Sequence, residues 1–248
     1  MALCATAQDL YIGRFYVTST TEEAQYGDGK DKWATRMPHI VDMFKYEQPD
    51  VLGLQSMTDS QLSVLSQRMT GYGKAGDILY NKSSVELDTC NVVEDMPEGC
   101  TGTWAKLRKG ETEFYVFNIC CIPTSAMSVA NRIRTVSTAL NPDNLPCFVV
   151  GYLGVSENNK TAYTRLTARF NDCYTSATYK SAEYGTVNNF DLTANHGTDR
   201  YDFVFASKDV TVKAYGQLQS GYLTKETDGT YKRRLLSTHF PVMAKVRM

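Results

Sequence analysis

The stretch at residues 49–56 restricts the fold most strongly. Val51, Leu52 and Leu54 form a nearly continuous apolar run, which is typical of a strand buried on both faces. The run follows a Pro-Asp turn and ends on the polar residue Ser56. Because α/β proteins present their chemistry at such strand ends, we expect an α/β fold with a site at this edge.

Composition limits the function classes. The chain has 248 residues, of which 42% are hydrophobic, and this is enough for one large core. The formal net charge of -1 gives no general attraction to nucleic acid, which is therefore an unlikely partner. No apolar run in the remainder of the chain is long enough to predict a membrane span. We predict a single domain over residues 9–248.

Residues 1–8 resemble the tail of a secretory signal peptide. Ala5-Thr6-Ala7 matches the small-x-small pattern of a cleavage site, although the basic and main apolar regions are absent. We therefore expect an exported protein (periplasmic, surface-bound or extracellular). The alternative is an ordinary terminus.

The cysteines leave the compartment open. Apart from Cys4 there are six, at positions 90, 100, 120, 121, 147 and 173. An even number suits an oxidising compartment, and Cys90 with Cys100 could close a short loop. Cys121 and Cys147 instead lie in apolar strand patterns, where buried free thiols are common. No Cys-x-x-Cys pair is present, so a zinc site is not expected.

The remaining patterns predict alternating strands and helices. Strands are expected at residues 11–20, 77–82, 85–87, 103–108, 113–118, 146–154 and 200–207, and helices at 33–44, 59–69, 128–140 and 163–170. In the first strand Arg14 and Tyr16 share the more polar face. Arg132 and Arg134 form either a solvated helix face or a phosphate-facing patch.

Several of these segments, taken in order, resemble signatures of one superfamily. Besides 49–56 they are Trp33 with Arg36, the Gly-Thr-Val-Asn-Asn-Phe loop at 185–190, Arg-Tyr-Asp-Phe-Val-Phe-Ala-Ser at 200–207 and Ser-Thr-His-Phe-Pro-Val at 237–242. The chain thus resembles the endonuclease/exonuclease/phosphatase superfamily of metal-dependent phosphoesterases. The resemblance implies a deoxyribonuclease-like four-layer α-β-β-α sandwich, with two mixed sheets flanked by helices and the site on loops at one end.

Most of the positions that carry catalysis in that superfamily are altered here. The resemblance implies that Asp202 and His239 are retained as an acid–imidazole pair. The lost groups are the asparagine after the first strand, the magnesium-binding glutamate, the phosphate-binding histidine, the aspartate and asparagine of Gly-Asp-Phe-Asn, and the aspartate before the last histidine. Their places are taken by Ser19 (or Thr18), Ser56, Cys120, Tyr152, Gly154 and Thr238.

Two functions from different classes follow. The favoured one is a non-catalytic binding or interaction protein, with no cofactor and an unknown small-molecule, glycan or protein ligand. The alternative is a weak or relocated-site phosphodiesterase, nuclease or phosphatase that uses Mg²⁺ or Mn²⁺. Its replacement acids would be Asp50, Asp77, Glu157 and Asp191.

Three further expectations concern the cleft. Cys120 with His239 would be a candidate for thiol chemistry, although a lone cysteine beside a strand is usually a core residue. Asn118 and Asn188 are candidate pocket residues. The aromatic side chains either fill the cleft or line a ligand pocket; they are Tyr16, Tyr152, Tyr184 and Phe190.

Overall fold

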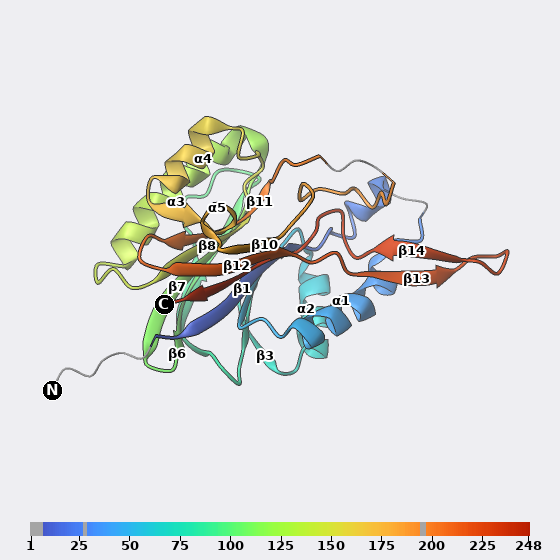
Figure 1. The fold of residues 1–248 in the computed structure, drawn as a ribbon, viewed down its shortest axis with the longest axis horizontal. Coiled ribbons are helices and arrows are strands. Elements are labelled where there is room, and N and C mark those ends of the chain that lie inside the picture. Colours follow the sequence, from blue (N-terminus) through green and yellow to red (C-terminus); the bar gives the residue numbers. More distant parts are fainter. Residues whose placement is uncertain (1–6, 27–28, 194–196) are drawn as a thin grey trace.

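Two mixed sheets pack face to face and carry helices on both outer surfaces (Figure 1). The computed structural model describes residues 7–26, 29–193 and 197–248. The four-layer α-β-β-α sandwich expected from the sequence is confirmed. Residues 1–6, which include Cys4 and most of the predicted signal-peptide tail, lie outside the described residues.

The first sheet has seven strands, in the order β10-β12-β15-β1-β2-β4-β3. Their bounds are β1 Asp9–Tyr16, β2 Val51–Gln55, β3 Tyr72–Ala75, β4 Ile78–Asn81, β10 Tyr179–Ser181, β12 Thr211–Gln217 and β15 Val242–Arg247. β1 runs parallel to β2 and antiparallel to β15, so it lies in the middle of the sheet.

The second sheet has six strands, in the order β5-β6-β7-β8-β11-β9. Their bounds are β5 Glu86–Val92, β6 Thr101–Lys109, β7 Thr112–Cys120, β8 Cys147–Tyr152, β9 Phe170–Asp172 and β11 Asp202–Ser207. β7 and β8 are parallel, whereas the β6–β7 hairpin predicted from the sequence is antiparallel. A separate hairpin of β13 (Gly221–Lys225) and β14 (Tyr231–Leu235) projects from the body (Figure 1).

The helices cover the outer faces of the two sheets. Their bounds are α1 Trp33–Glu47, α2 Asp59–Arg68, α3 Ala126–Leu140, α4 Lys160–Thr167 and α5 Cys173–Ser176, with 3₁₀ turns η1 Glu23–Gln25 and η2 Pro123–Ser125. α2 begins with a capping box between Thr58 and Gln61. α1 ends at Glu47 and is followed by Gln48, which adopts the left-handed conformation.

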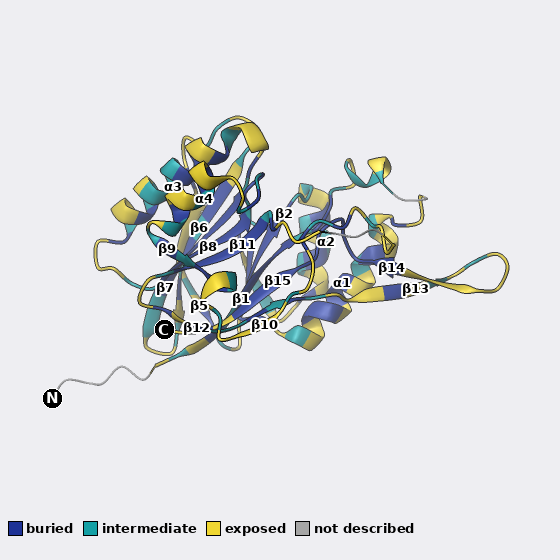
Figure 2. Ribbon diagram, turned by 45° about the horizontal axis from the view of Figure 1, so that its top comes forward, coloured by how far each residue is buried: buried dark blue, intermediate teal, exposed yellow. Residues whose placement is uncertain are grey.

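Three apolar clusters hold the layers together. One lies between the sheets, a second joins α3 and α4 to the second sheet, and a third joins α1 and α2 to the first sheet. The central strands of both sheets are accordingly buried, while the edge strands β5 and β10, the outer helix surfaces and the hairpin tip are exposed (Figure 2). Within the described ranges, no helix is long and apolar enough to cross a membrane.

Some predicted boundaries were wrong. β1 ends at Tyr16 rather than at residue 20, because Thr18 takes a positive φ of 67° and ends the extended run. The last three residues of the predicted helix at 163–170 are not helical: α4 ends at Thr167, and Phe170 opens β9. The strand predicted at 85–87 is longer, because β5 runs from Glu86 to Val92.

Candidate active site

The positions singled out by the sequence meet at one edge of the sandwich. β1 and β2 end there with Tyr16 and Gln55 side by side. In the second sheet, Tyr152 at the end of β8 lies between Cys120 of β7 and Asp202 of β11. The location of the site at these strand ends, predicted from residues 49–56, therefore agrees with the fold.

Asp202 and His239 form the predicted pair. The His239 Nδ1 atom lies 2.8 Å from Asp202 Oδ2, and both side chains are buried, with exposed fractions of 7% and 0%. A third member was not predicted: the Arg14 guanidinium, also fully buried, lies 2.6 Å from Asp202 Oδ1. Burial by itself would raise the Asp202 pKa, but Arg14 and then His239 outweigh burial and hold that pKa below its ordinary value.

Two tyrosine rings close over this pair. Tyr16 stacks on His239 with ring centroids 4.0 Å apart, and Tyr152 meets both rings edge-on, at 5.2 Å from Tyr16 and 5.3 Å from His239. Such offset and edge-to-face contacts are favourable ring geometries. Tyr16 and Tyr152 therefore fill the space above Asp202 and His239. Tyr184 is exposed, and Phe190 packs against Tyr26 instead.

Thr18, rather than Ser19, faces the site. Its hydroxyl lies 2.6 Å from the Thr238 hydroxyl and 2.8 Å from the Ser237 hydroxyl, and it accepts a hydrogen bond from the Thr238 backbone. Ser19 instead accepts a hydrogen bond from the Glu22 backbone, at the start of η1. A hydroxyl pair thus occupies two positions where the resemblance implies polar catalytic groups.

Ser56 is hydrogen-bonded to a carboxylate, that of Glu22, which no sequence pattern predicted. The Ser56 hydroxyl donates to Glu22 Oε2 at 2.7 Å, and the Tyr16 hydroxyl donates to both Glu22 oxygens at 3.1 Å. Glu22 lies in the segment after β1, 34 positions from Ser56 in the chain. No motif marks it, and only the course of this segment in space brings its carboxylate to the site.

Gly154 has no room for a side chain. It takes a φ of 76°, and a Cβ atom placed on it would lie 2.8–2.9 Å from backbone atoms of Cys121, Ile122 and Pro123. The backbone at residues 121–123 therefore occupies the volume in which the implied asparagine would lie.

The Cys120 thiol is not set up as a nucleophile. Burial raises its pKa to about 12, and the opposing effect of Arg14 is smaller. Because the thiolate is the reactive form, this site suppresses thiol chemistry.

The two candidate pocket residues are structural. Asn118 is buried between the sheets, where its amide donates to the Leu54 carbonyl at 2.8 Å and accepts from the Gln55 side chain. Asn188 is also buried; its backbone donates to the Thr238 carbonyl at 2.7 Å, and its side-chain oxygen accepts from Phe190 at 2.9 Å. Both candidate pocket residues are thus buried, and neither lines any of the four surface hollows described below.

The four proposed replacement acids lie apart from one another. Asp50 binds Lys109 and the Tyr11 backbone at the opposite end of β2. Asp77 is buried near Asn118, and burial raises its pKa. Glu157 binds the Arg200 backbone, and Asp191 binds Thr193 in a loop. No pair of them joins Asp202 and His239, as a relocated site would require.

The donor set does not fit the implied magnesium centre. Mg²⁺ prefers several oxygen ligands in octahedral geometry. Asp202 is committed to Arg14 and His239, and Glu22 to Tyr16 and Ser56. In the described part of the chain, no group of three or more His, Cys, Asp or Glu residues is placed to hold a metal ion.

Four surface hollows in the described ranges lie elsewhere. One of about 690 Å³ lies between the exposed surfaces of α3 and α4 and is lined by Arg134, Arg165 and Arg169. Arg132 does not line this hollow and instead forms an ion pair with Asp95. Three others lie near the β13–β14 hairpin, around β3 and β4, and at the start of β8. None of the four is lined by Asp202 or His239.

Other predicted residues have structural roles or cannot pair as expected. Arg36 is buried and donates to the carbonyls of Val17, Thr18 and Leu236, which anchors α1 as predicted. Cys90 lies opposite Ala105, which is five residues from Cys100, or about 16.5 Å at some 3.3 Å per residue. A disulfide needs Cα atoms within about 7 Å, so the suggested Cys90–Cys100 loop was wrong.

Solved structures share this architecture. A Bacteroides thetaiotaomicron endonuclease/exonuclease/phosphatase family protein superposes with a TM-score of 0.87, at 22% identity over 98% of both chains. A mannosyl-6-phosphatase of the same organism gives 0.84, at 22% identity over 96% of this chain and 99% of that one. A Bacteroides vulgatus family protein gives 0.79, at 18% identity over 96% and 98%.

The fold therefore defines a deoxyribonuclease-like α/β sandwich. The chain has the fold of endonuclease/exonuclease/phosphatase proteins, which confirms the predicted resemblance at the level of architecture. No family model matches the sequence, and no curated protein matches it.

Proposed function

We propose that this chain is an exported, non-catalytic binding or interaction protein built on the phosphoesterase fold. The observation that carries the proposal is the closure of the site. Arg14 and His239 occupy both oxygens of Asp202, Tyr16 and Tyr152 cover the pair, and residues 121–123 fill the space beside Gly154.

The missing groups make turnover unfavourable. Phosphodiester hydrolysis in this superfamily needs a metal cradle, an oriented water and donors for the charge that develops on phosphate. Loss of one such donor costs about 2.7–4 kcal/mol in the transition state. Losses within one constellation are not additive, but their combination is expected to leave hydrolysis near the background rate.

Export and ligand class remain part of the proposal. Export is supported by the signal-like pattern at residues 1–8 and by the even number of cysteines after Cys4. The ligand is a small molecule, a glycan or a protein rather than nucleic acid, because the net charge of -1 gives no general attraction to phosphate backbones. No cofactor is expected.

Hydrolysis of bis-p-nitrophenyl phosphate tests this proposal. The purified chain is assayed with Mg²⁺, Mn²⁺ or EDTA beside an active phosphoesterase of the same fold, and its thermal shift is measured with each ion. We expect no turnover above buffer and no metal-induced shift. EDTA-sensitive turnover that co-purifies with the protein would overturn the proposal.

One observation favours the alternative, a weak metal-dependent phosphoesterase. Glu22 brings a carboxylate against Ser56, where the resemblance implies a metal-binding glutamate. One neighbour in fold is a mannosyl-6-phosphatase, so phosphomonoesters belong in the substrate panel. If this alternative holds, Glu22→Gln should abolish metal-dependent turnover, whereas Glu111→Gln, at an exposed hairpin turn, should retain it.

A further inference from the structure

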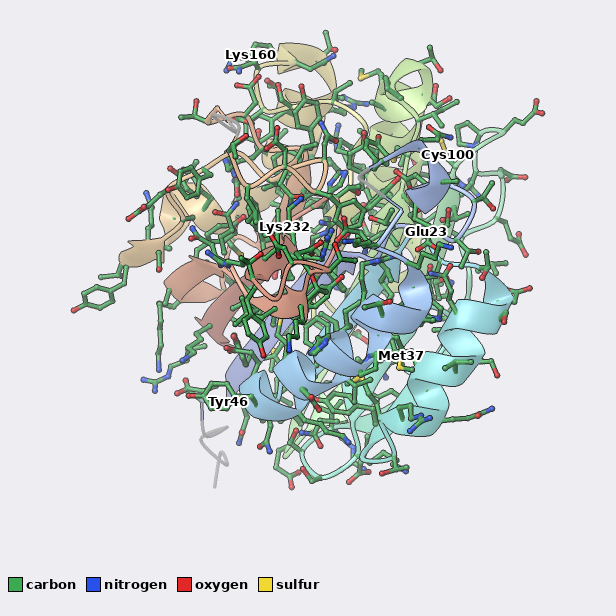
Figure 3. All side chains as sticks on the ribbon, turned by 90° about the vertical axis from the view of Figure 1, so that its right-hand side faces the viewer. Glu23, Met37, Tyr46, Cys100, Lys160 and Lys232 are labelled. Carbon is green, nitrogen blue, oxygen red and sulfur yellow. The ribbon has the colours of Figure 1, made fainter. Side chains whose placement is uncertain are left out.

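Two cysteines face each other just beyond the paired region of the β6–β7 hairpin. In that hairpin Gly102 lies opposite Ile119 and Thr101 lies opposite Cys120. One further step along both chains brings Cys100 opposite Cys121. Cys100 is labelled at the right of Figure 3.

The backbone geometry at this step suits a cross-link. The Cys121 backbone N–H donates to the Tyr152 carbonyl of β8 at 3.0 Å, so its polar groups turn away from β6. Cys100 and Cys121 thus occupy a non-hydrogen-bonded antiparallel position, where Cα atoms lie about 4.5 Å apart and side chains are closest. Disulfides span Cα distances of about 4.4–6.8 Å.

The side chains agree with this placement. The Ile122 backbone N–H donates to Cys100 Sγ at 3.5 Å, and the nearby Cys100 thiol contributes to the raised pKa of Cys121. Both side chains pack into the apolar cluster beneath α3. Cys121 is buried and Cys100 is partly exposed.

We propose that Cys100 and Cys121 form a disulfide that fastens the segment before β6 to the end of β7. The oxidant is a small-molecule or protein disulfide. The Cys100 thiolate attacks one of its sulfurs and releases the first thiol, which leaves a mixed disulfide. Cys121 then attacks the Cys100 sulfur as it gives its proton to solvent, which releases the second thiol; because burial raises the pKa of Cys121, this second step is the slow one. Two protein thiols become one disulfide, and the donor disulfide becomes two thiols.

The cross-link would act next to the candidate site. The cross-link closes a loop around the whole β6–β7 hairpin. It also fixes the position of Cys121, which directly follows the candidate-site residue Cys120. The same backbone segment, residues 121–123, fills the space beside Gly154. Formation of the disulfide therefore holds residues 121–123 in the position in which they fill the space beside Gly154. The inference does not depend on the proposed function.

Peptide mapping tests the pairing directly. The full chain is oxidised with oxidised glutathione, denatured, alkylated and digested with trypsin without reduction. We expect peptides 83–106 and 110–132 to be joined. Because these peptides also contain Cys90 and Cys120, Cys90→Ser and Cys120→Ser are the matched controls and should keep the cross-link. Cys100→Ser and Cys121→Ala should lose it.

A stability measurement gives a second readout. Reduction should lower the Tm of the oxidised wild type by roughly 10 °C and leave the Tm of Cys100→Ser unchanged. Full alkylation of both cysteines in the oxidised wild type would overturn the inference, and this result needs no variant to fold. A cross-link that disappears in Cys90→Ser or in Cys120→Ser would also overturn it.

Discussion

Replacing Asp202 by asparagine should destabilise the protein severely, because it leaves a buried cation without its counter-ion. Arg14 and Asp202 are both fully buried, with Nη1 and Oδ1 2.6 Å apart. Removing one partner of such a pair costs about 3–5 kcal/mol in the free energy of unfolding. At about 2–4 °C per kcal/mol for a chain of this size, the Tm should fall by about 6–20 °C.

A double-mutant cycle identifies the cause. Unfolding in urea, followed by tryptophan fluorescence and circular dichroism, gives the free energies of the wild type, Asp202→Asn, Arg14→Met and the double variant. When Arg14 is replaced as well, Asp202→Asn no longer leaves a buried cation without a counter-ion. The coupling energy between the two substitutions should therefore be at least about 2 kcal/mol. His239→Gln, which keeps the Arg14–Asp202 contact, should cost less than Asp202→Asn. A cost below about 1 kcal/mol for Asp202→Asn, or additive effects in the cycle, would refute this reasoning.

Four shorter predictions follow from the same site. Since the pKa of folded Asp202 lies below its ordinary value of 3.8, its stabilising effect is complete above that value and is lost as the pH falls through the folded pKa. The advantage of the wild type over Asp202→Asn in thermal unfolding should therefore be constant above about pH 5 and shrink below about pH 4. Asp77 has the opposite shift, because burial raises its pKa above 3.8. Asp77→Asn should thus compare more favourably with wild type at pH 7 than at pH 4 in urea unfolding, and an equal difference in the free energy of unfolding at both pH values would contradict this. With a pKa of about 12, Cys120 should be alkylated by iodoacetamide at pH 8 at least about a hundredfold more slowly than exposed Cys90, and comparable labelling rates would show that Cys120 is accessible and ionised. Gly154→Asn should lower the free energy of unfolding by about 3 kcal/mol or more, and a variant as stable as wild type would mean that residues 121–123 yield easily.

The sequence predicted the sandwich well where a local pattern and a motif coincided. Residues 49–56 became β2 and the polar edge that follows it, and the aromatic run at residues 114–117 lies in β7 as expected. The Asp202–His239 pair was also found, because both residues lie in recognisable segments.

The parts that were missed depend on contacts between distant segments. Alternation in the first strand suggested a polar face for Arg14 and Tyr16, yet β1 lies mid-sheet between two layers, so Arg14 is buried against Asp202. Glu22 reaches Ser56 only through the course of the segment after β1. The sequence predicted that the helix would continue to Phe170, but Phe170 begins strand β9. This strand pairs with β11, and such tertiary pairing can override local helix propensity.

The close approach at Gly154 also constrains any attempt to rebuild a phosphoesterase site on this chain. Ser56, Cys120, Tyr152 and Thr238 can each be exchanged as side chains on the existing framework. Position 154 differs, because the backbone of residues 121–123 already occupies the space that a side chain at this position would need. Installing a donor at this position is therefore a problem of backbone design, in which the 121–123 segment has to be rerouted before the new residue can be introduced.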